Sequence, residues 1–205
     1  VLADRAGIPA GVFNVLSSSR SSEIGKEFCE NEKVRKLTFT GSTEVGRILM
    51  AQAAPRILKL SLELGGKSPF VVFEDADLDS VVEGVVDAIW FNQGQVCCAG
   101  SRLLVQEGIA DRFYAKLKTR MDGLRIGNPL DKCIDVGAIV DPVQLETITK
   151  MVSNNDAGEL FQADVEIPKN GCFYPPTLLT NVSPSSTVVQ EEIFGPVLVA
   201  MTFRT

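Results

Sequence analysis

The chain of 205 residues contains no histidine at all. This absence excludes Ser-His-Asp and Cys-His catalysis within the chain, and it excludes zinc sites of the HExxH type. Any general base that the chain supplies must therefore be a carboxylate, a lysine or a tyrosine. We expect no metal site.

Long apolar runs and basic clusters are also missing. No apolar run approaches the roughly 20 residues that a helix needs to span a bilayer. The net charge is -6 and no group of Lys and Arg residues stands out, so neither a membrane nor nucleic acid is expected as a partner. Apolar residues make up 45% of the sequence and charged residues 22%, which is typical of a globular protein with a buried core.

Cysteines are few, and their number is odd. Five cysteines at irregular spacing favour reduced thiols over a disulfide framework, which predicts a cytoplasmic location. The chain begins at Val1 without a signal-peptide pattern and stops at Thr205 directly after an apolar run. We therefore expect a fragment of a longer protein.

Strand-like and helix-like stretches alternate along most of the chain. Alternation with short connections predicts an α/β protein with a parallel sheet. A break at Gly65-Gly66 divides the chain into residues 1–64 and 65–205. Strands are expected at residues 12–16, 37–40, 58–62, 69–73 and 103–106, and after Pro196. Helices are expected at residues 22–30 (with Ser22 as the cap), 43–53, 109–121 and 142–152, and from about residue 77.

The helix from about residue 77 has a clear sequence pattern, whereas the region before Pro196 has none. The helix that begins near Asp77 has apolar residues three and four positions apart, which predicts one buried face. The region between the last expected helix and Pro196 contains Pro175, Pro176 and Pro184 and is expected to be rich in turns.

Cys97 lies in the sequence Gly-Gln-Val-Cys-Cys-Ala-Gly, between an apolar helix and a strand. Small residues on both sides would let a substrate approach the sulfur, and a thiolate is a strong nucleophile. The alternative is that Cys97 is only a small buried hydrophobic residue. This motif alone does not decide between the two.

Glu63 lies at the end of a predicted buried strand, in the sequence Leu-Glu-Leu-Gly-Gly-Lys-Ser-Pro. Desolvation between leucines would raise the pKa of this carboxylate toward the range of a general base. The alternative is a structural ion pair with Lys67 or an arginine, and the local residues favour that alternative.

Gly41 and Ser42 connect a predicted strand to a predicted helix, in the sequence Phe-Thr-Gly-Ser-Thr-Glu-Val-Gly. Free backbone N–H groups and the positive end of a helix suit a phosphate group. The alternative is that Ser42 or Thr43 only caps the helix.

Glu192 and Phe194 lie in the sequence Glu-Glu-Ile-Phe-Gly-Pro-Val, which is expected to be extended. Residues two positions apart on an extended segment project to the same side. The pair would then accept hydrogen bonds from ribose hydroxyl groups and pack on a ring. The alternative is an ordinary acidic turn before a strand.

Together, these four stretches resemble the aldehyde dehydrogenase superfamily in their order and separation. AGIPAGVFNV, DADLD, GNPLD and FYPPTLL extend the resemblance over essentially the whole chain. DLDSVVEGVVDAIW, RLLVQEGI and the closing FRT are similar to the sixteenth family, whose long members carry two dehydrogenase-like modules. The resemblance implies the α/β, parallel-sheet aldehyde dehydrogenase-like fold. Residues 1–64 would form the C-terminal half of a Rossmann-like dinucleotide-binding domain, and residues 65–205 a catalytic domain truncated at its C-terminus.

The resemblance implies that Cys97 is the nucleophile and Glu63 the general base. In the implied reaction, the Cys97 thiolate attacks an aldehyde, and the thiohemiacetal loses a hydride to the nicotinamide. Glu63 then activates the water that hydrolyses the thioester. The backbone N–H of Cys97 would help to hold the developing oxyanion. This reaction needs no histidine, and Cys98 is expected to be structural or to tune its neighbour.

The resemblance also implies a cofactor site for NAD, with NADP left open. The substrate would be a small-molecule aldehyde, and the longer protein would form a homo-oligomer. The family's oxyanion-hole asparagine and the first half of its cofactor sheet precede Val1. The isolated chain is therefore expected to bind NAD weakly and to turn over slowly or not at all. By position, the cofactor would be held by Gly41 and Ser42 at the pyrophosphate, Leu64 and Gly65 near the nicotinamide, and Glu192 and Phe194 at the nicotinamide ribose.

Two other functions stay open at this point. One is a catalytically silent scaffold that retains the fold, and the reactivity of Cys97 distinguishes it from an enzyme. The other is an enzyme that releases its thioester to coenzyme A or phosphate. Glu63 argues against this second alternative, because hydrolysis is the reaction that needs a base to activate water.

Overall fold

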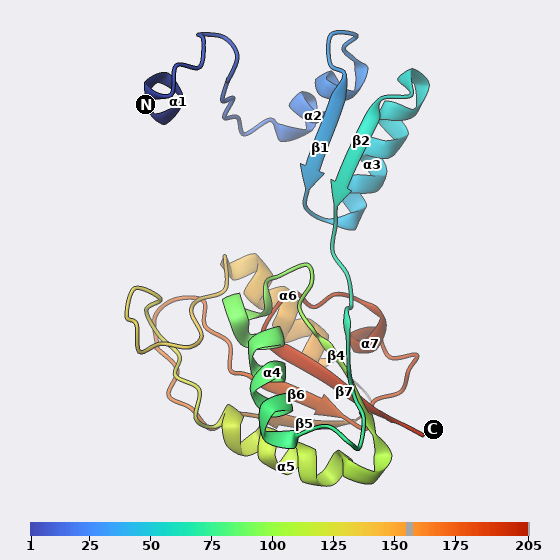
Figure 1. Ribbon diagram of the computed structural model, residues 1–205, viewed down its shortest axis with the longest axis vertical. Coiled ribbons are helices and arrows are strands. Elements are labelled where there is room, and N and C mark those ends of the chain that lie inside the picture. Colours follow the sequence, from blue (N-terminus) through green and yellow to red (C-terminus); the bar gives the residue numbers. More distant parts are fainter. Residues whose placement is uncertain (155–157, 205) are drawn as a thin grey trace. The chain divides into compact units, whose positions relative to one another are not determined.

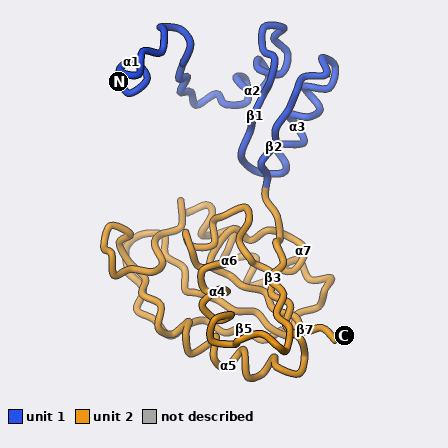
Figure 2. The backbone as a smooth tube through the Cα atoms, in the orientation of Figure 1, with its two compact units in different colours: residues 1–64 blue, residues 65–205 orange. Residues whose placement is uncertain are grey.

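The structure, a computed structural model, describes residues 1–154 and 158–204. The chain divides into two compact units, Val1–Leu64 and Gly65–Thr205, which Figure 2 shows in different colours. Each unit contains a β-sheet of its own. Within the described residues, no helix combines the length and the apolarity needed to cross a bilayer.

The first unit is a pair of parallel strands joined by a helical crossover, with a second helix packed against the crossover helix (Figure 1). Its small core is formed by Cys29, Leu49 and Ala53. The strands expected at residues 37–40 and 58–62 are confirmed to within one residue. In chain order, its elements are α1 (Leu2–Arg5), α2 (Ser21–Glu30), β1 (Lys36–Thr40), α3 (Thr43–Ala53), η1 (Ala54–Arg56) and β2 (Lys59–Glu63).

Ser42 starts the crossover helix α3. Its hydroxyl oxygen accepts a hydrogen bond from the backbone N–H of Val45 at 3.3 Å, which satisfies one of the N–H groups left free at a helix start. The N–H of Gly41 donates to the carbonyl of Glu63 at 3.0 Å, so the C-terminal ends of β1 and β2 are tied together. The capping role considered for Ser42 is therefore confirmed, and its hydroxyl already has a partner.

Two expectations in this unit are wrong. Residues 12–16 form no strand, and the side chains of Val12, Phe13, Val15 and Leu16 are between 69% and 77% exposed. No strand among the described residues pairs with this segment, and a lone extended segment gains no ladder hydrogen bonds. Ser22 is not a cap either, because α2 already begins one residue earlier and has no side-chain cap.

The second unit contains a five-stranded sheet in the order β3-β4-β7-β6-β5. All neighbouring strands are parallel except β5 and β6, which are antiparallel. The strands expected at residues 69–73, at 103–106 and after Pro196 are confirmed. The five strands are β3 (Pro69–Val72), β4 (Arg102–Gln106), β5 (Glu159–Gln162), β6 (Thr177–Thr180) and β7 (Val197–Phe203).

Helices cover both faces of this sheet (Figure 1). Side chains alternate along each strand, so Leu178 and Leu198 pack with α4 and α5, while Leu179 and Val199 pack with α6 and α7. The buried face predicted for the helix after Asp77 is confirmed in α4. The helices are α4 (Leu78–Trp90), η2 (Phe91–Gly94), η3 (Glu107–Ile109), α5 (Ala110–Met121), α6 (Pro142–Ser153) and α7 (Thr187–Gln190).

The region before Pro196 is rich in turns, as expected, but it also contains an interior strand of the sheet that the sequence did not predict. All four residues of β6 are buried between β5 and β7. Thr177 begins β6, and its hydroxyl donates to the carbonyl of Pro175 at 2.8 Å, which satisfies a buried polar group. Pro175 and Pro176 come directly before this strand, and the strand has only four residues, with a threonine at each end. So short an apolar stretch beside two prolines gives little strand signal in the sequence.

We predict that Leu103→Ala will destabilise the second unit by about 2–5 kcal/mol, because Leu103 is fully buried between β4 and the helices α4 and α5. Urea unfolding followed by circular dichroism measures the change. Val71→Ala is the matched control: Val71 lies on the adjacent strand β3 and is 46% exposed. Equal losses in the two variants would contradict the assignment of the buried face.

Candidate active site

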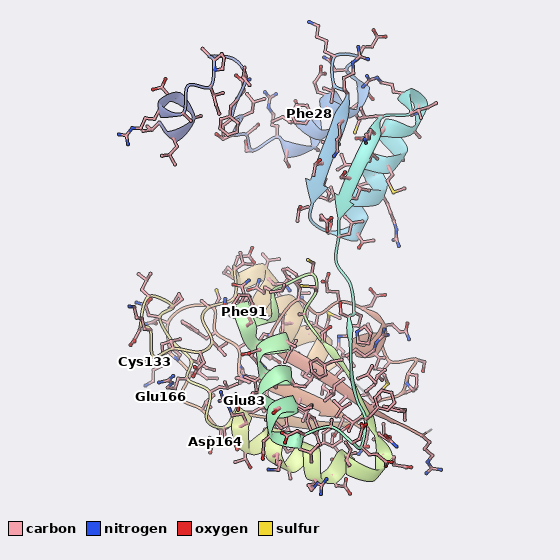
Figure 3. The ribbon with its side chains drawn as sticks, in the orientation of Figure 1. Phe28, Glu83, Phe91, Cys133, Asp164 and Glu166 are labelled. Atoms are coloured by element: carbon pink, nitrogen blue, oxygen red, sulfur yellow. The ribbon has the colours of Figure 1, made fainter. Side chains whose placement is uncertain are left out.

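The segment that carries Cys97 begins at a sharp change of direction after α4. Asn92, Gln93 and Gly94 follow one another in the left-handed region, with φ of 48°, 58° and 70°. Two consecutive non-glycine residues in this region cost free energy that the surroundings must offset. The turn brings Cys97 and Cys98 to an exposed position. Figure 3 shows Phe91, the first residue of the turn, at the end of α4.

Two glutamine side chains hold this turn in place. Gln93 donates from Nε2 to the carbonyl of Ala138 at 3.2 Å. The side-chain oxygen of Gln95 accepts from the N–H of Val140 at 3.2 Å. Both contacts reach the segment that precedes α6, so the cysteine loop is fixed to a part of the chain about 45 residues away.

The segment 193–196 packs directly on the same turn. A Cβ added at Gly94 would overlap the carbonyl of Gly195, so the two backbones meet with no side chain between them. Trp90, at the end of α4, donates from Nε1 to the carbonyl of Pro196 at 3.1 Å. The end of α4, the cysteine loop and the segment before β7 are therefore joined by one close backbone contact and one side-chain hydrogen bond.

Phe194 does not lie on a regular extended segment, so the expectation that Glu192 and Phe194 project to the same side of one is wrong. Phe194 has φ of 53°, in the left-handed region. Gln144 of α6 holds this conformation, because its Nε2 donates to the carbonyls of Ile193 and Phe194, both at 3.0 Å. The Phe194 side chain remains 37% exposed.

The Glu192 carboxylate lies on the pair Gly65-Gly66. Its Oε1 accepts a hydrogen bond from the N–H of Gly66 at 3.1 Å. A Cβ at Gly65 would overlap the other carboxylate oxygen, whereas a Cβ at Gly66 would lie 3.7 Å from the carbonyl oxygen of Cys97. The second unit thus brings together Cys97, Gly65 and Glu192 from three separate motifs, and Phe194 lies two positions after Glu192 in the chain.

Lys67 follows this glycine pair and carries a buried charge. Its Nζ is inaccessible to solvent and has no hydrogen-bond partner among the described residues. The pKa of Lys67 is lowered from 10.5 to about 8, mainly because the charged group is buried. The charge of Arg102 contributes to this lowering, and the charge of Glu192 partly opposes it.

Gly41, Ser42, Glu63 and Leu64 belong to the first unit. Gly41 and Ser42 connect β1 to α3, and Leu64 packs against Gly46 of α3. Glu63 ends β2, as expected, but its side chain is exposed. The expectation that Glu63 is desolvated between leucines is therefore wrong: Leu62 and Leu64 are only partly buried, because this small sheet has just two strands.

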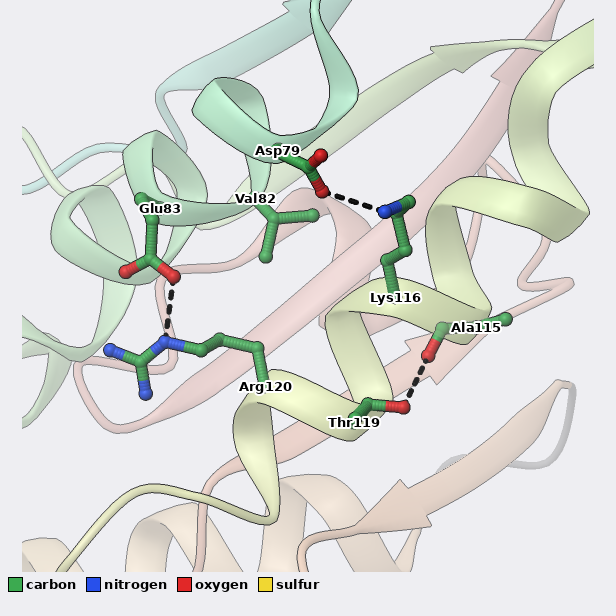
Figure 4. A pocket seen from close by; sticks show the side chains of 7 residues that line it. All are labelled: Asp79, Val82, Glu83, Ala115, Lys116, Thr119 and Arg120. Carbon is green, nitrogen blue, oxygen red and sulfur yellow. Dashed lines mark hydrogen bonds and ion pairs between the residues drawn. The ribbon is translucent and has the colours of Figure 1, made fainter.

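A groove of about 590 Å³ between α4 and α5 contains none of the predicted site residues. Two ion pairs bridge it, Lys116 to Asp79 at 2.6 Å and Arg120 to Glu83 at 2.8 Å (Figure 4). The charges that line the groove therefore already have partners, and the groove is a surface feature of the helix pair.

Several residues that build this region were not found from the sequence. The cysteine loop and the segment 193–196 are held by side-chain hydrogen bonds to backbone atoms from Trp90, Gln93, Gln95 and Gln144. Only Gln93 and Gln95 gave a signal, through their place beside the cysteine motif. Gln144 gave none, because it lies about 50 residues from its partners on an ordinary helix.

The model of the aldehyde dehydrogenase family matches residues 1–205, so the chain belongs to this family. The expected family and α/β fold class are confirmed. The chain is 42% identical over 205 residues to the glutarate-semialdehyde dehydrogenase of Pseudomonas aeruginosa, covering 99% of this chain and 42% of that protein. It is also 42% identical over 205 residues to the NADP(+)-dependent succinate-semialdehyde dehydrogenase of Escherichia coli, with the same two coverages.

A solved structure agrees with this assignment. The crystal structure of an NAD-dependent aldehyde dehydrogenase from Sinorhizobium meliloti matches with a TM-score of 0.95 at 39% identity, over 100% of this chain and 41% of that chain. The chain thus spans about two fifths of the length of these relatives. Its kinship to the sixteenth family stays a prediction.

We predict that Gly65→Ala will displace the Glu192 carboxylate and cost about 1–3 kcal/mol of stability, because the new methyl group overlaps a carboxylate oxygen. A crystal structure and urea unfolding measure both effects. Gly66→Ala is the matched control, since its methyl group would make an ordinary van der Waals contact. An undisturbed Glu192 in Gly65→Ala would contradict the packing described for this pair.

We predict that Lys67→Met will remove a pH dependence of stability. The pKa of Lys67 in the folded protein, about 8, is below its ordinary 10.5. Burying the charged form therefore costs free energy below pH 8, by about 3 kcal/mol at 1.36 kcal/mol per pKa unit. This cost disappears as the pH rises to 10.5. The unfolding free energies of the native protein and the variant should therefore converge across this range, and a constant difference would contradict the prediction.

Proposed function

We propose that the whole protein is an NAD(P)-dependent aldehyde dehydrogenase that oxidises an aldehyde to a carboxylic acid through a thioester on Cys97. The observation that carries the proposal is the meeting of three motifs in the second unit. The exposed Cys97 follows a turn that is clamped to the segment 193–196, and Glu192 lies on the glycine pair beside the Cys97 carbonyl. Family membership supports the same reaction.

Cys97 supplies the nucleophile. Its sulfur bonds to the aldehyde carbon and gives a thiohemiacetal oxyanion, which the N–H of Cys97 helps to stabilise. When the oxyanion collapses, the carbon loses a hydride and a thioester remains on Cys97. The nicotinamide, when bound, supplies the acceptor for this hydride. The strained turn before Cys97 favours this role, because costly backbone strain clusters at functional sites. The side chains of Gln93 and Gln95 hold the turn in this conformation.

Glu63 supplies the general base for hydrolysis. It takes a proton from water, the hydroxide adds to the thioester carbon, and the Cys97 thiolate leaves as the acid is released. Its place at the C-terminal end of a parallel strand supports the proposal, because ligand sites in α/β sheets lie at these ends. An exposed carboxylate is also free to approach a water molecule.

Six residues would hold the cofactor. The start of α3 offers N–H groups and a positive helix end to the pyrophosphate, although the Ser42 hydroxyl is engaged in capping. Near the nicotinamide ribose, the Glu192 carboxylate has acceptor capacity beyond its single bond to Gly66, which fits two ribose hydroxyl groups. The six residues are Gly41, Ser42, Leu64, Gly65, Glu192 and Phe194.

The substrate is proposed to be a small-molecule aldehyde. The names of the two relatives make succinate semialdehyde and glutarate semialdehyde the first compounds to assay, with both NAD and NADP. A cytoplasmic location and a homo-oligomeric state belong to the same proposal.

We predict that Cys97→Ser will lower the rate of NAD(P)H formation from an aldehyde by at least about 10³-fold, because a hydroxyl group is a far weaker nucleophile than a thiolate. Absorbance at the wavelength of the reduced nicotinamide follows the reaction. Cys98→Ser is the matched control and should retain most of the activity. Full activity in Cys97→Ser would refute the proposed nucleophile, and an inactive native protein would favour the scaffold.

We predict that Glu63→Gln will accumulate the thioester. The variant should still transfer one hydride per active site, but hydrolysis should slow by about 10²–10⁴-fold without its base. Mass spectrometry of the quenched enzyme would find the acyl group on the peptide that carries Cys97. A variant that neither accumulates this adduct nor slows in turnover would show that another group activates the water.

A further inference from the structure

The ammonium group of Lys67 is a buried charge that the proposed reaction does not use. Its Nζ is inaccessible to solvent and finds no acceptor among the described residues. Desolvation of an unpaired charge is costly. A methionine or leucine at this position would avoid that cost while filling the same space, so the charge itself calls for an explanation.

The surroundings of Lys67 point to the Glu192 carboxylate. Gly65 lies against this carboxylate, Gly66 donates to it at 3.1 Å, and Lys67 is the next residue in the chain. Arg102 supplies a second positive charge and is tied to the same stretch, since its N–H donates to the carbonyl of Ser68 at 3.2 Å. The interaction with Glu192 favours the charged form of Lys67, against the effects of burial and of Arg102.

We propose that Lys67 is a positioning residue that holds the ionised Glu192 carboxylate against Gly65-Gly66, in the orientation that accepts the hydroxyl groups of the nicotinamide ribose. The binding of the ribose by Glu192 rests on the proposed function. The coupling between Lys67 and Glu192 does not depend on it.

The hydrogen bond from Gly66 alone satisfies only part of the Glu192 carboxylate. A partly buried carboxylate has several lone pairs to satisfy, and Gly66 supplies a single N–H donor. A buried ammonium acts through a medium of low dielectric constant, where charges attract over longer distances than in water. Lys67 therefore holds the carboxylate without occupying the lone pairs that a ribose would use.

A double-mutant cycle on the whole protein tests the coupling by thermal unfolding, with Lys67→Met, Glu192→Gln and the double variant. Lys67→Met should raise the melting temperature in both backgrounds. The rise should be larger by about 2–4 °C in the Glu192→Gln background, where the ammonium has lost its carboxylate. Equal rises would overturn the proposal. If Lys67→Met does not fold, Lys67→Gln serves in the same cycle.

Lys118→Met is the matched control. The Lys118 ammonium lies on α5 over the ring of Phe161, 5.3 Å from its centroid, and interacts with a ring instead of a carboxylate. Its effect on the melting temperature should be the same with and without Glu192→Gln. A non-additive result for Lys118 equal to that for Lys67 would overturn the specific coupling.

Kinetics then tests the purpose of the coupling. Lys67→Met should raise KM for NAD about tenfold and leave KM for the aldehyde unchanged, and Lys67→Arg should restore part of the loss. An unchanged KM for NAD in an active variant would overturn the positioning role. A native protein that oxidises no aldehyde would refute the proposed function, and the melting cycle would still decide the coupling of Lys67 to Glu192.

Discussion

The close approach of two backbones at Gly94 and Gly195 is the constraint on which the arrangement of the second unit depends. Any side chain at Gly94 would separate the cysteine loop from the segment before β7. The hydrogen bond from Trp90 to Pro196 spans the same junction and fixes the end of α4 to the start of that strand. The left-handed backbone of residues 92–94 is strained, and these contacts before and within the turn hold it in place. The same turn leads to the exposed Cys97.

The junction of Gly94 and Gly195 also positions the residues to which we assign the chemistry. Next to the fixed segment 193–196, the Glu192 carboxylate lies on the glycine pair that also borders Cys97. Cys97, the proposed nucleophile, and the carboxylate proposed for the ribose are thus positioned by the close backbone approach at Gly94 and by side-chain hydrogen bonds to backbone atoms. The buried ammonium of Lys67 adds charge to the same stretch, at a cost in stability.

Sequence reasoning predicted the elements that follow a simple period. The buried face of α4 and the parallel strands β3, β4 and β7 were predicted because each has its own apolar pattern. The strand at residues 12–16 was predicted wrongly, since strand formation depends on a partner. The motifs identified the candidate residues, yet the left-handed turn at Phe194 and the support from Gln144 arise from contacts between distant segments, which no local pattern records.

We infer that this framework presents Cys97 as the reactive thiol of the protein. The most direct test is alkylation of the whole native protein with iodoacetamide, followed by mass spectrometry of each cysteine peptide over time. Cys97 should react faster than Cys98 and Cys133, which are also exposed, and NAD together with an aldehyde substrate should protect it. Equal rates at the three exposed cysteines, with no protection, would show that Cys97 is not the reactive thiol.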